Sequence, residues 1–327
     1  MASFLSVVLV ILILAIVFKL YIKLSVKRNG SYVCLTGKTA VITGANSGLG
    51  YITALDFAKR GARVILGCRN GDKAEEAVKK IIAATNNKNI VYKLVDCASL
   101  KSVRNFAQDI IENEARLDIL VNNAGISSDE EGLTPDGIQT ILQVNHISGF
   151  LLTHLLIDKL KKSTPSRIIM VASPTARFAN LNLNTLRDLN TATLSRRFYA
   201  MYYNSKLCNI AFAIEMAKRL DGSGVTINAV HPGVATTEIV RDAKLWVKFG
   251  FNTFTSLFLY TAEEGAQTQI YASVANEIVN INGDFFGNCN RIEVYKTAKD
   301  PEFLRKLWEK SEELAKLSDG EKIPLLV

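Results

Sequence analysis

The chain has 327 residues, 48% of them hydrophobic, and a formal net charge of +8 at pH 7. This length suits one large α/β domain or two small ones. The five cysteines are scattered without a Cys-x-x-Cys pair, and the three histidines have no cluster of cysteine or acidic residues at ligand spacing. The composition therefore argues against a disulfide framework and against a metal site.

The first 22 residues are almost entirely apolar. Ala2 to Phe18 carry no charge, and the run continues to Ile22 with one lysine in it, which is about the 20 residues needed to cross a bilayer. Basic residues follow the run and no acidic residue occurs before Asp56, a distribution that favours keeping the following chain in the cytosol. We therefore predict a membrane anchor at 1–22, with a cleaved or hairpin-inserted segment as the alternative.

A basic juxtamembrane segment at 23–36 follows the predicted anchor, and residues 37–327 form the rest of the chain. Basic residues around the anchor supply five of the net eight positive charges: Lys19, Lys23, Lys27, Arg28 and Lys38. Because this charge gathers next to an apolar run, it indicates a membrane flank and not a nucleic-acid partner. No Pro/Gly/Ser-rich linker or repeat interrupts 37–327, so we predict one domain there.

Short apolar runs alternate with helical stretches along the predicted domain. The strand-like runs are Val41–Thr43, Val64–Leu66, Val91–Val95, Ile119–Val121, Arg167–Val171 and Val225–Ala229. This rhythm predicts right-handed βαβ units and a parallel sheet buried on both faces. The predicted fold class is therefore α/β, with a single doubly wound domain.

A glycine-rich turn follows the first of these strands. The strand Lys38–Thr43 runs into Gly44–Gly50, which has the spacing Gly-x-x-x-Gly-x-Gly, and a helical stretch, Tyr51–Arg60, comes next. Strand, turn and helix together place backbone N–H groups and a helix N-terminus where a pyrophosphate can bind. A tight strand-to-helix turn without a ligand is the alternative.

The next predicted strand is followed by an arginine. An NAD site usually carries an acidic residue near this point to bind the ribose 2′-hydroxyl. Here the acid is missing, and Cys68 and Arg69 follow the strand Arg63–Gly67. A guanidinium in this place can form a charge-assisted bond to a 2′-phosphate. The pattern favours NADP(H), and an ordinary surface arginine is the alternative.

Tyr202 and Lys206 stand four residues apart in a stretch, 199–220, that we predict to be helical. The i, i+4 spacing puts the phenol and the ammonium on one face, where the cation favours the phenolate and lowers a pKa that is otherwise about 10. A tyrosine tuned in this way can transfer a proton near neutral pH, as carbonyl reduction or alcohol oxidation requires. An exposed lysine beside a half-buried tyrosine is the alternative.

Further short motifs accompany these two sites. The full set is Thr43-Gly-Ala-Asn-Ser-Gly-Leu-Gly50, Asn122-Asn-Ala-Gly125, Asn145, Ser173, Tyr202-x-x-x-Lys206 and His231-Pro-Gly233. In this order and approximate spacing they are typical of the short-chain dehydrogenase/reductases, which the chain resembles from about residue 37 to its end. Val144-Asn-His146 and Thr261–Thr268 are most similar to the membrane-anchored retinol dehydrogenase branch. The resemblance implies a Rossmann-type fold and a nicotinamide cofactor.

The resemblance also implies a role for each motif. Tyr202 would be the acid/base, Lys206 would lower its pKa and bond the nicotinamide ribose, and Ser173 would hydrogen-bond the substrate oxygen. Asn145, on a helix expected to span about 135–162, would hold a water that relays protons behind the lysine. The residues implied in cofactor binding are Gly44, Asn46, Ser47, Gly48, Leu49, Gly50, Arg69, Asp96, Cys97, Asn123, Ala124, Gly125, Tyr202, Lys206, Pro232, Gly233 and Thr236.

Several of these roles have a structural alternative. Ser173 can be a turn serine ahead of Pro174, and Asn145 can satisfy backbone groups at a helix kink. Asn122–Gly125 can be a turn at the end of a strand, and Asp96 can cap the helix that follows it.

An aromatic stretch follows the motif His231-Pro-Gly233. Six aromatic residues lie between 245 and 260: Trp246, Phe249, Phe251, Phe254, Phe258 and Tyr260. The resemblance places a substrate loop at about 234–262, and an apolar flap there suits a long hydrophobic substrate delivered from the bilayer. A pair of amphipathic helices whose aromatic residues close the core is the alternative.

Taken together, these features predict an NADP(H)-dependent enzyme that interconverts a lipophilic alcohol and its aldehyde or ketone, with retinol and retinaldehyde as the preferred pair. The alternative substrates are a steroid, a polyprenal or a lipid-derived aldehyde. The alternative of another class is an inactive membrane-tethered scaffold that binds the cofactor. We expect the anchor in the endoplasmic reticulum membrane, or on lipid droplets, with the catalytic domain facing the cytosol. Related enzymes often pair through the helices that carry Asn145 and Tyr202, so a homodimer is allowed.

Overall fold

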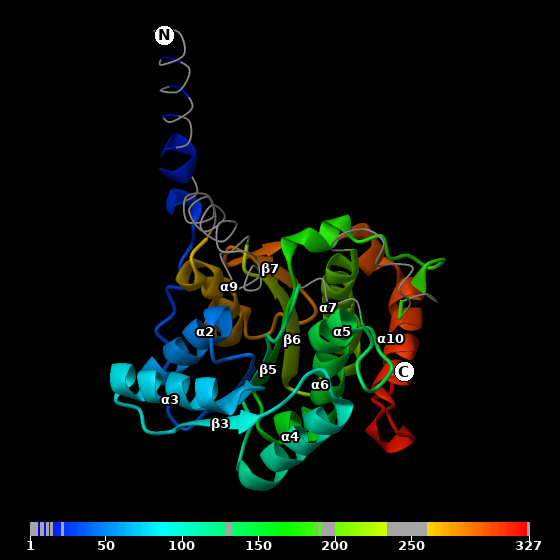
Figure 1. Cartoon of the computed structure of the whole chain (residues 1–327), viewed down its shortest axis with the longest axis horizontal. Helices are drawn as coiled ribbons and strands as arrows, with labels where there is room; N and C mark the ends of the chain where they lie inside the picture. Colours follow the sequence, from blue (N-terminus) through cyan, green and yellow to red (C-terminus); the bar gives the residue numbers. More distant parts are fainter. Residues whose placement is uncertain are drawn as a thin grey trace.

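An eight-stranded sheet crosses the middle of the protein (Figure 1). The computed structural model describes residues 6, 10, 13, 16–20, 23–127, 132–186, 189–190, 200–233 and 260–325. The strands are β1 (Thr39–Thr43), β2 (Arg63–Cys68), β3 (Ile90–Leu94), β4 (Ile119–Asn122), β5 (Ser166–Val171), β6 (Val225–His231), β7 (Phe285–Gly287) and β8 (Asn290–Ile292). Their order is β3-β2-β1-β4-β5-β6-β7-β8, and every pairing is parallel except that of β7 with β8.

Helices cover both faces of this sheet (Figure 1). One layer contains α2 (Gly48–Lys59), α3 (Gly71–Thr85) and α9 (Ala262–Val274). The other contains α4 (Leu100–Asn113), α5 (Thr140–Leu142), α6 (Ser148–Lys162), α7 (Ala200–Arg219) and α10 (Pro301–Ala315). Side chains of a strand point alternately to the two layers. In β1, accordingly, Ala40 and Ile42 belong to the core under α2 and Val41 to the core under α4.

The α/β fold and all six predicted strands are confirmed, and two parts of the prediction are wrong. The sheet is not wholly parallel, because β8 returns antiparallel after a two-residue turn. The helix expected from about residue 135 begins at Thr140, and a π-helical turn, Gln143–Ile147, interrupts it before α6. β7 and β8 went unpredicted because each has only three residues, too short for a periodic pattern.

One helical stretch among the described residues, Thr140–Lys162, is long and apolar enough to cross a membrane, and 83% of its apolar window is buried inside the protein. This burial identifies it as a core helix of the domain.

Most of the predicted anchor at 1–22 lies outside the described residues. Residues 16–20 and 23–25 are helical, and this helix projects from the body beside α9 and β7 (Figure 1). Lys38 was counted with the basic flank, but its ammonium pairs with the Asp118 carboxylate at 2.9 Å where β1 and β4 begin. That charge therefore belongs to the domain and not to the membrane flank.

Candidate active site

The glycine-rich turn leads from β1 into α2 in a conformation that needs its glycines. Gly44 and Gly48 have φ values of +66° and +56°, in the left-handed region that side chains disfavour. A Cβ on Gly50 would lie 2.4 Å from the Gly44 carbonyl oxygen, so this helix residue also lacks room for a side chain. The spacing thus allows the strand, turn and helix to pack closely.

The N-terminus of α2 is open to an anion. Its N-cap residue, Ser47, makes no side-chain capping bond, whereas Asn70 and Ser99 cap the described helices α3 and α4. An uncapped first turn offers backbone N–H groups and the positive end of the helix dipole. The turn therefore fits the pyrophosphate of a dinucleotide, to which Gly44, Asn46, Ser47, Gly48, Leu49 and Gly50 were assigned from the sequence.

Asn123 fastens this turn to the end of β4. Its side-chain amide donates to the carbonyl oxygens of Thr43 and Gly44 at 2.8 and 3.2 Å. The Thr43 hydroxyl in turn accepts from the backbone N–H groups of Asn123 and Ala124, both at 3.0 Å. These bonds show that Asn122–Gly125 forms a turn at the end of a strand, which was the structural alternative for this motif. The same turn forms a wall of the predicted nucleotide site.

Three residues predicted for the adenosine end lie near one another. Arg69 is exposed between β2 and α3. Asp96 accepts from the Ala98 N–H at 2.9 Å and closes a turn ahead of Ser99, which is the actual cap of α4. Burial raises the pKa of the Cys97 thiol to about 11, and the charges of Asp96 and Arg69 act on the same thiol.

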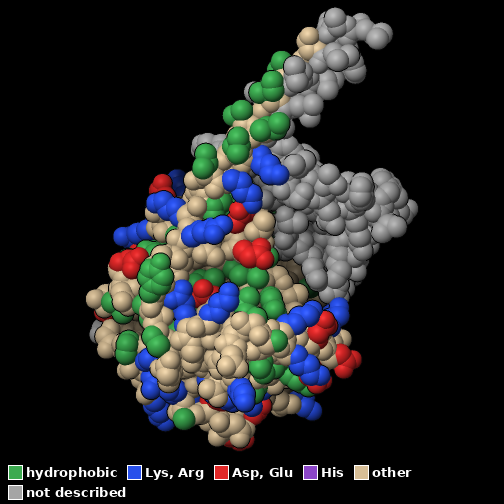
Figure 2. All heavy atoms as spheres, turned by 90° about the vertical axis from the view of Figure 1, so that its left-hand side faces the viewer, with side chains coloured by type: hydrophobic (Ala, Val, Ile, Leu, Met, Phe, Trp, Pro, Cys, Tyr) green, Lys and Arg blue, Asp and Glu red, His purple; other side chains and the backbone are tan. Residues whose placement is uncertain are grey.

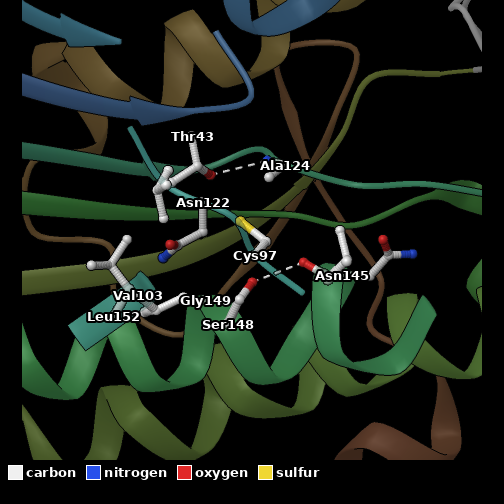
Figure 3. Close-up of a pocket in the computed structure, with 11 residues that line it drawn as sticks. Thr43, Cys97, Val103, Asn122, Ala124, Asn145, Ser148, Gly149 and Leu152 are labelled. Atoms are coloured by element: carbon white, nitrogen blue, oxygen red, sulfur yellow. Dashed lines mark hydrogen bonds between the residues drawn. The ribbon is translucent and has the colours of Figure 1, made fainter. Parts of the chain in front are cut away.

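A small cavity lies between the ends of β1 and β4 and the helices α4 and α6 (Figure 3). It measures about 10 Å³, and three predicted site residues, Cys97, Ala124 and Asn145, line it together with Asn122. The Asn122 amide oxygen is buried and has no hydrogen-bond partner among the described residues. A cavity of this size holds about one water molecule, so the predicted site residues are packed closely on this side.

Lys206 reaches the site from the second turn of α7. Its side chain is only 4% exposed, and its ammonium donates to the Val171 carbonyl oxygen at 3.1 Å. The ammonium lies 5.6 Å from the centre of the Tyr202 ring. A Cβ on Gly125 would lie 3.2 Å from the same nitrogen, which explains the glycine there. Burial lowers the pKa of Lys206 to about 8, so the side chain is still mainly cationic at pH 7.

The pKa of Tyr202 shifts in the direction opposite to the one expected. We predicted that Lys206 would lower it, whereas burial raises it, and a hydrogen bond with Ser173 only partly opposes the rise. The physical reason is that removing the phenol from water penalises the phenolate. In this structure the tyrosine is therefore a protonated acid at neutral pH.

Ser173 follows β5 and has features of both predicted roles, the turn serine ahead of Pro174 and the site serine. It is the N-cap of a short 3₁₀ helix, Pro174–Phe178, and its hydroxyl accepts from the Thr175 N–H at 3.2 Å. The same hydroxyl lies 2.8 Å from the Thr175 hydroxyl and is close enough to the Tyr202 phenol to oppose the rise in its pKa. The serine thus forms a turn and faces the tyrosine.

Asn145 lies in the π-helical turn and ties it to the strand-end loop and to α7. Its side chain accepts from the Ile126 N–H at 2.8 Å and donates to the Ile126 carbonyl at 2.9 Å. It also donates to the Ser205 hydroxyl at 3.0 Å. The alternative was that Asn145 satisfies backbone groups at a helix kink; it does lie in the kink, but the backbone groups that it satisfies are those of Ile126 in the strand-end loop. The asparagine, Ser173, Tyr202 and Lys206 are brought together.

Comparison with known proteins identifies the family. Residues 38–185 match the family model described as short chain dehydrogenase. The chain is 42% identical to dehydrogenase/reductase SDR family member 13 of Bos taurus, over 88% of this chain and 75% of that protein. It is 40% identical to retinol dehydrogenase 14 of Homo sapiens, over 88% of each chain.

The chain belongs to the short-chain dehydrogenase family. A crystal structure of an uncharacterized protein from Mycobacterium paratuberculosis has the same fold, with a TM-score of 0.72 and 30% sequence identity over 92% of this chain and 100% of that one. The resemblance that the motifs carried is thereby confirmed, including its similarity to retinol dehydrogenases.

A buried chain of hydrogen bonds lies behind the site of this short-chain dehydrogenase and was not predicted from the sequence. Asn209 donates to the carbonyl oxygens of Asn145 and Val171 at 2.9 and 3.1 Å. Its amide oxygen lies 3.0 Å from His146, whose other ring nitrogen lies 3.0 Å from the Ser311 hydroxyl on α10. One signal was present: Asn209 stands three residues after Lys206, on the same helix face. The contact with Ser311 has no sequence signature.

The last predicted residues lie at and beyond the end of β6. Gly233 has a φ of +74° and donates its N–H to the His231 ring at 3.0 Å, and Pro232 stands between them. Thr236 and the aromatic residues between 245 and 259 lie outside the described residues, and of the predicted aromatic flap only Tyr260 is described.

Proposed function

We propose that this short-chain oxidoreductase uses NADP(H) to interconvert a lipophilic alcohol and its aldehyde or ketone, with retinol and retinaldehyde as the preferred pair. The observation that carries the proposal is the meeting of Ser173, Tyr202 and Lys206 beside the glycine-rich turn. The relatives named retinol dehydrogenases support the substrate class.

The residues present fit a dinucleotide. The open N-terminus of α2 takes the pyrophosphate. The exposed guanidinium of Arg69 would hold the 2′-phosphate, and Asp96 and Cys97 would line the adenosine site. From its place beside Gly125, Lys206 would bond the nicotinamide ribose. When bound, NADPH supplies the hydride.

The protein's own residues manage the proton. Because burial keeps Tyr202 protonated at neutral pH, its hydroxyl can give a proton to a carbonyl oxygen as negative charge develops there. Ser173 donates a second hydrogen bond to the same oxygen. The Lys206 cation, held by the Val171 carbonyl, stabilises the phenolate left behind, and Asn145 positions the water that returns the proton. A protonated tyrosine is the form that can act as the acid in carbonyl reduction.

We place the protein in a membrane through residues 1–22, with 23–36 as the basic juxtamembrane segment and 37–327 as the catalytic domain in the cytosol. Apolar side chains along the projecting helix are at least half exposed: Val10, Ile13, Ile16, Val17, Phe18, Leu20 and Leu24. Figure 2 shows this apolar helix, with basic side chains where it meets the body. An exposed apolar surface of this kind suits a lipid environment. The endoplasmic reticulum is the proposed membrane, and lipid droplets are the alternative.

The experiment that tests this function is NADPH oxidation by detergent-solubilised protein given all-trans-retinaldehyde, with NADH measured in parallel. We expect turnover with NADPH. Turnover only with steroid or polyprenyl carbonyls would replace the substrate and keep the reaction. Bound NADPH without turnover of any carbonyl would favour the inactive scaffold.

Replacing Arg69 with alanine should change the cofactor preference. Loss of a charge-assisted hydrogen bond to the 2′-phosphate lowers kcat/KM for NADPH by about ten- to a hundredfold, while kcat/KM for NADH stays within about twofold, since NADH lacks that phosphate. Steady-state kinetics with both dinucleotides measure the effect. Arg305→Ala removes an exposed arginine of α10 and is the control. An equal loss with both cofactors would show that Arg69 does not read the phosphate.

A further inference from the structure

The juxtamembrane chain docks on the catalytic domain before it reaches β1. We call residues 23–33 the strap. The Lys23 ammonium forms an ion pair with Glu264 in the first turn of α9. One turn later along that helix, the Gln267 side chain accepts from the Asn29 N–H at 3.0 Å. Two turns of α9 thus hold the strap.

The β7–β8 hairpin holds the strap from a second direction. Its two turn residues, Asn288 and Cys289, have φ values of +48° and +55°, as a two-residue hairpin turn with positive φ at both positions requires. The Asn288 side chain accepts from the Lys27 N–H and donates to the Ser25 carbonyl, both at 2.8 Å. This amide therefore binds the strap backbone on both its polar groups.

These two docking elements are the ones that border the proposed substrate loop. The N-terminus of α9 follows directly after Tyr260, and a Cβ on Gly233 would lie 2.5 Å from the Tyr260 ring, so the two ends of the loop meet. On the hairpin, a Cβ on Gly287 would lie 2.2 Å from the ring of His231, the last residue of β6. The strap is thus fastened where the loop begins and ends.

We infer that the strap fixes the mouth of the active site against the bilayer, so that a lipophilic substrate enters from the membrane without crossing water. The inference rests on the proposed function and its membrane anchor. The projecting helix leaves the body beside α9 and β7 (Figure 1), which puts the loop ends next to the lipid surface. An undocked segment of this length would behave as a flexible tether and let the domain turn its mouth away.

A double variant that removes the Lys23 ion pair and both Asn288 bonds, called the released variant, can spare the fold. Glu264→Gln removes the ion pair and keeps the capping box with Thr261, because glutamine also serves in that motif. Asn288→Gly removes both amide bonds and keeps the positive φ. The matched control combines Glu263→Gln, in the same helical turn, with Asn86→Gly, another positive-φ asparagine at the end of α3.

Release is measured first by trypsin, which cuts after the strap's Lys23, Lys27 and Arg28. In phospholipid vesicles, the released variant should be cut faster than the control. Its KM for retinaldehyde dissolved in the vesicles should rise about fivefold, as expected when the productive orientation falls to about a fifth of the population. KM for a small water-soluble aldehyde should not change. Faster cleavage with unchanged retinaldehyde KM, or equal loss on both aldehydes, would overturn the inference, and so would unchanged cleavage.

A second readout separates failure of the inference from failure of the proposed function. Cys34 is the first residue after the strap, and hydrogen bonding with Thr36 lowers the pKa of its exposed thiol, so a fluorophore can be attached there. A quencher on the lipid headgroups should reach this fluorophore more in the released variant than in the control. If the enzyme turns over no carbonyl, this quenching alone tests whether the strap orients the domain. Equal quenching in the released variant and the control would then reject the inference.

Discussion

Tyr202→Phe is expected to remove turnover and leave NADPH binding intact. The substitution deletes only the phenolic hydroxyl, which lies beside Ser173 and is the proposed proton donor. Loss of a positioned general acid lowers kcat by about 10²- to 10⁴-fold. The aromatic ring and its packing are unchanged, and the hydroxyl is expected to act in the transition state and not in cofactor binding. The Kd for NADPH, measured by the quenching of protein fluorescence, should therefore stay within about twofold of the wild type.

The neighbouring tyrosine provides the control. Tyr203 stands next in α7 and its ring lies 5.9 Å from that of Phe178, a contact that phenylalanine keeps. Tyr203→Phe should retain nearly all activity. A Tyr202→Phe enzyme that kept more than about a tenth of the wild-type kcat would be outside the range for a lost general acid and would send the search for the proton donor elsewhere.

The nucleotide end could be predicted from the sequence because its determinants are local. Gly44 and Gly48 need positive φ, and the strand, the turn and the helix are all encoded in one continuous stretch, residues 39–59. The strands of the sheet were equally visible, since a buried parallel strand is a continuous apolar run. Only the three-residue strands β7 and β8, at one edge of the sheet, were not predicted.

The features that were not predicted depend on contacts between residues far apart in the chain. The His146–Ser311 bond joins residues 165 positions apart, and the Lys27–Asn288 bond joins residues 261 apart. No spacing rule reports such pairs. The predicted direction of the Tyr202 pKa shift was wrong for a related reason. The i, i+4 spacing indicates a nearby cation, whereas the degree of burial depends on the whole fold. Burial outweighs the neighbour here.

Burial makes the charged form of Lys206 destabilising, so Lys206→Met should stabilise the fold while it impairs catalysis. The pKa of this lysine falls from 10.5 to about 8, and at 1.36 kcal/mol per unit the charged form costs about 3 kcal/mol on folding. Methionine fills similar space without charge, and the Val171 carbonyl keeps its bond from Asn209. We expect the free energy of unfolding at pH 7, measured in urea, to rise by about 1–3 kcal/mol, the range left after one hydrogen bond is lost.

The pH dependence distinguishes this cause from better packing. Between pH 8 and 10.5 the unfolded chain keeps the Lys206 proton and the folded chain has released it, so the wild type gains stability as the pH rises. The advantage of Lys206→Met should therefore be full below pH 8 and disappear by about pH 10.5. Lys101→Met, at an exposed position of α4, is the control. An advantage that stays constant across this window would mean that packing, not the buried charge, sets the stability. If it does disappear, the fold retains a destabilising cation at the position where the proposed proton transfer needs one.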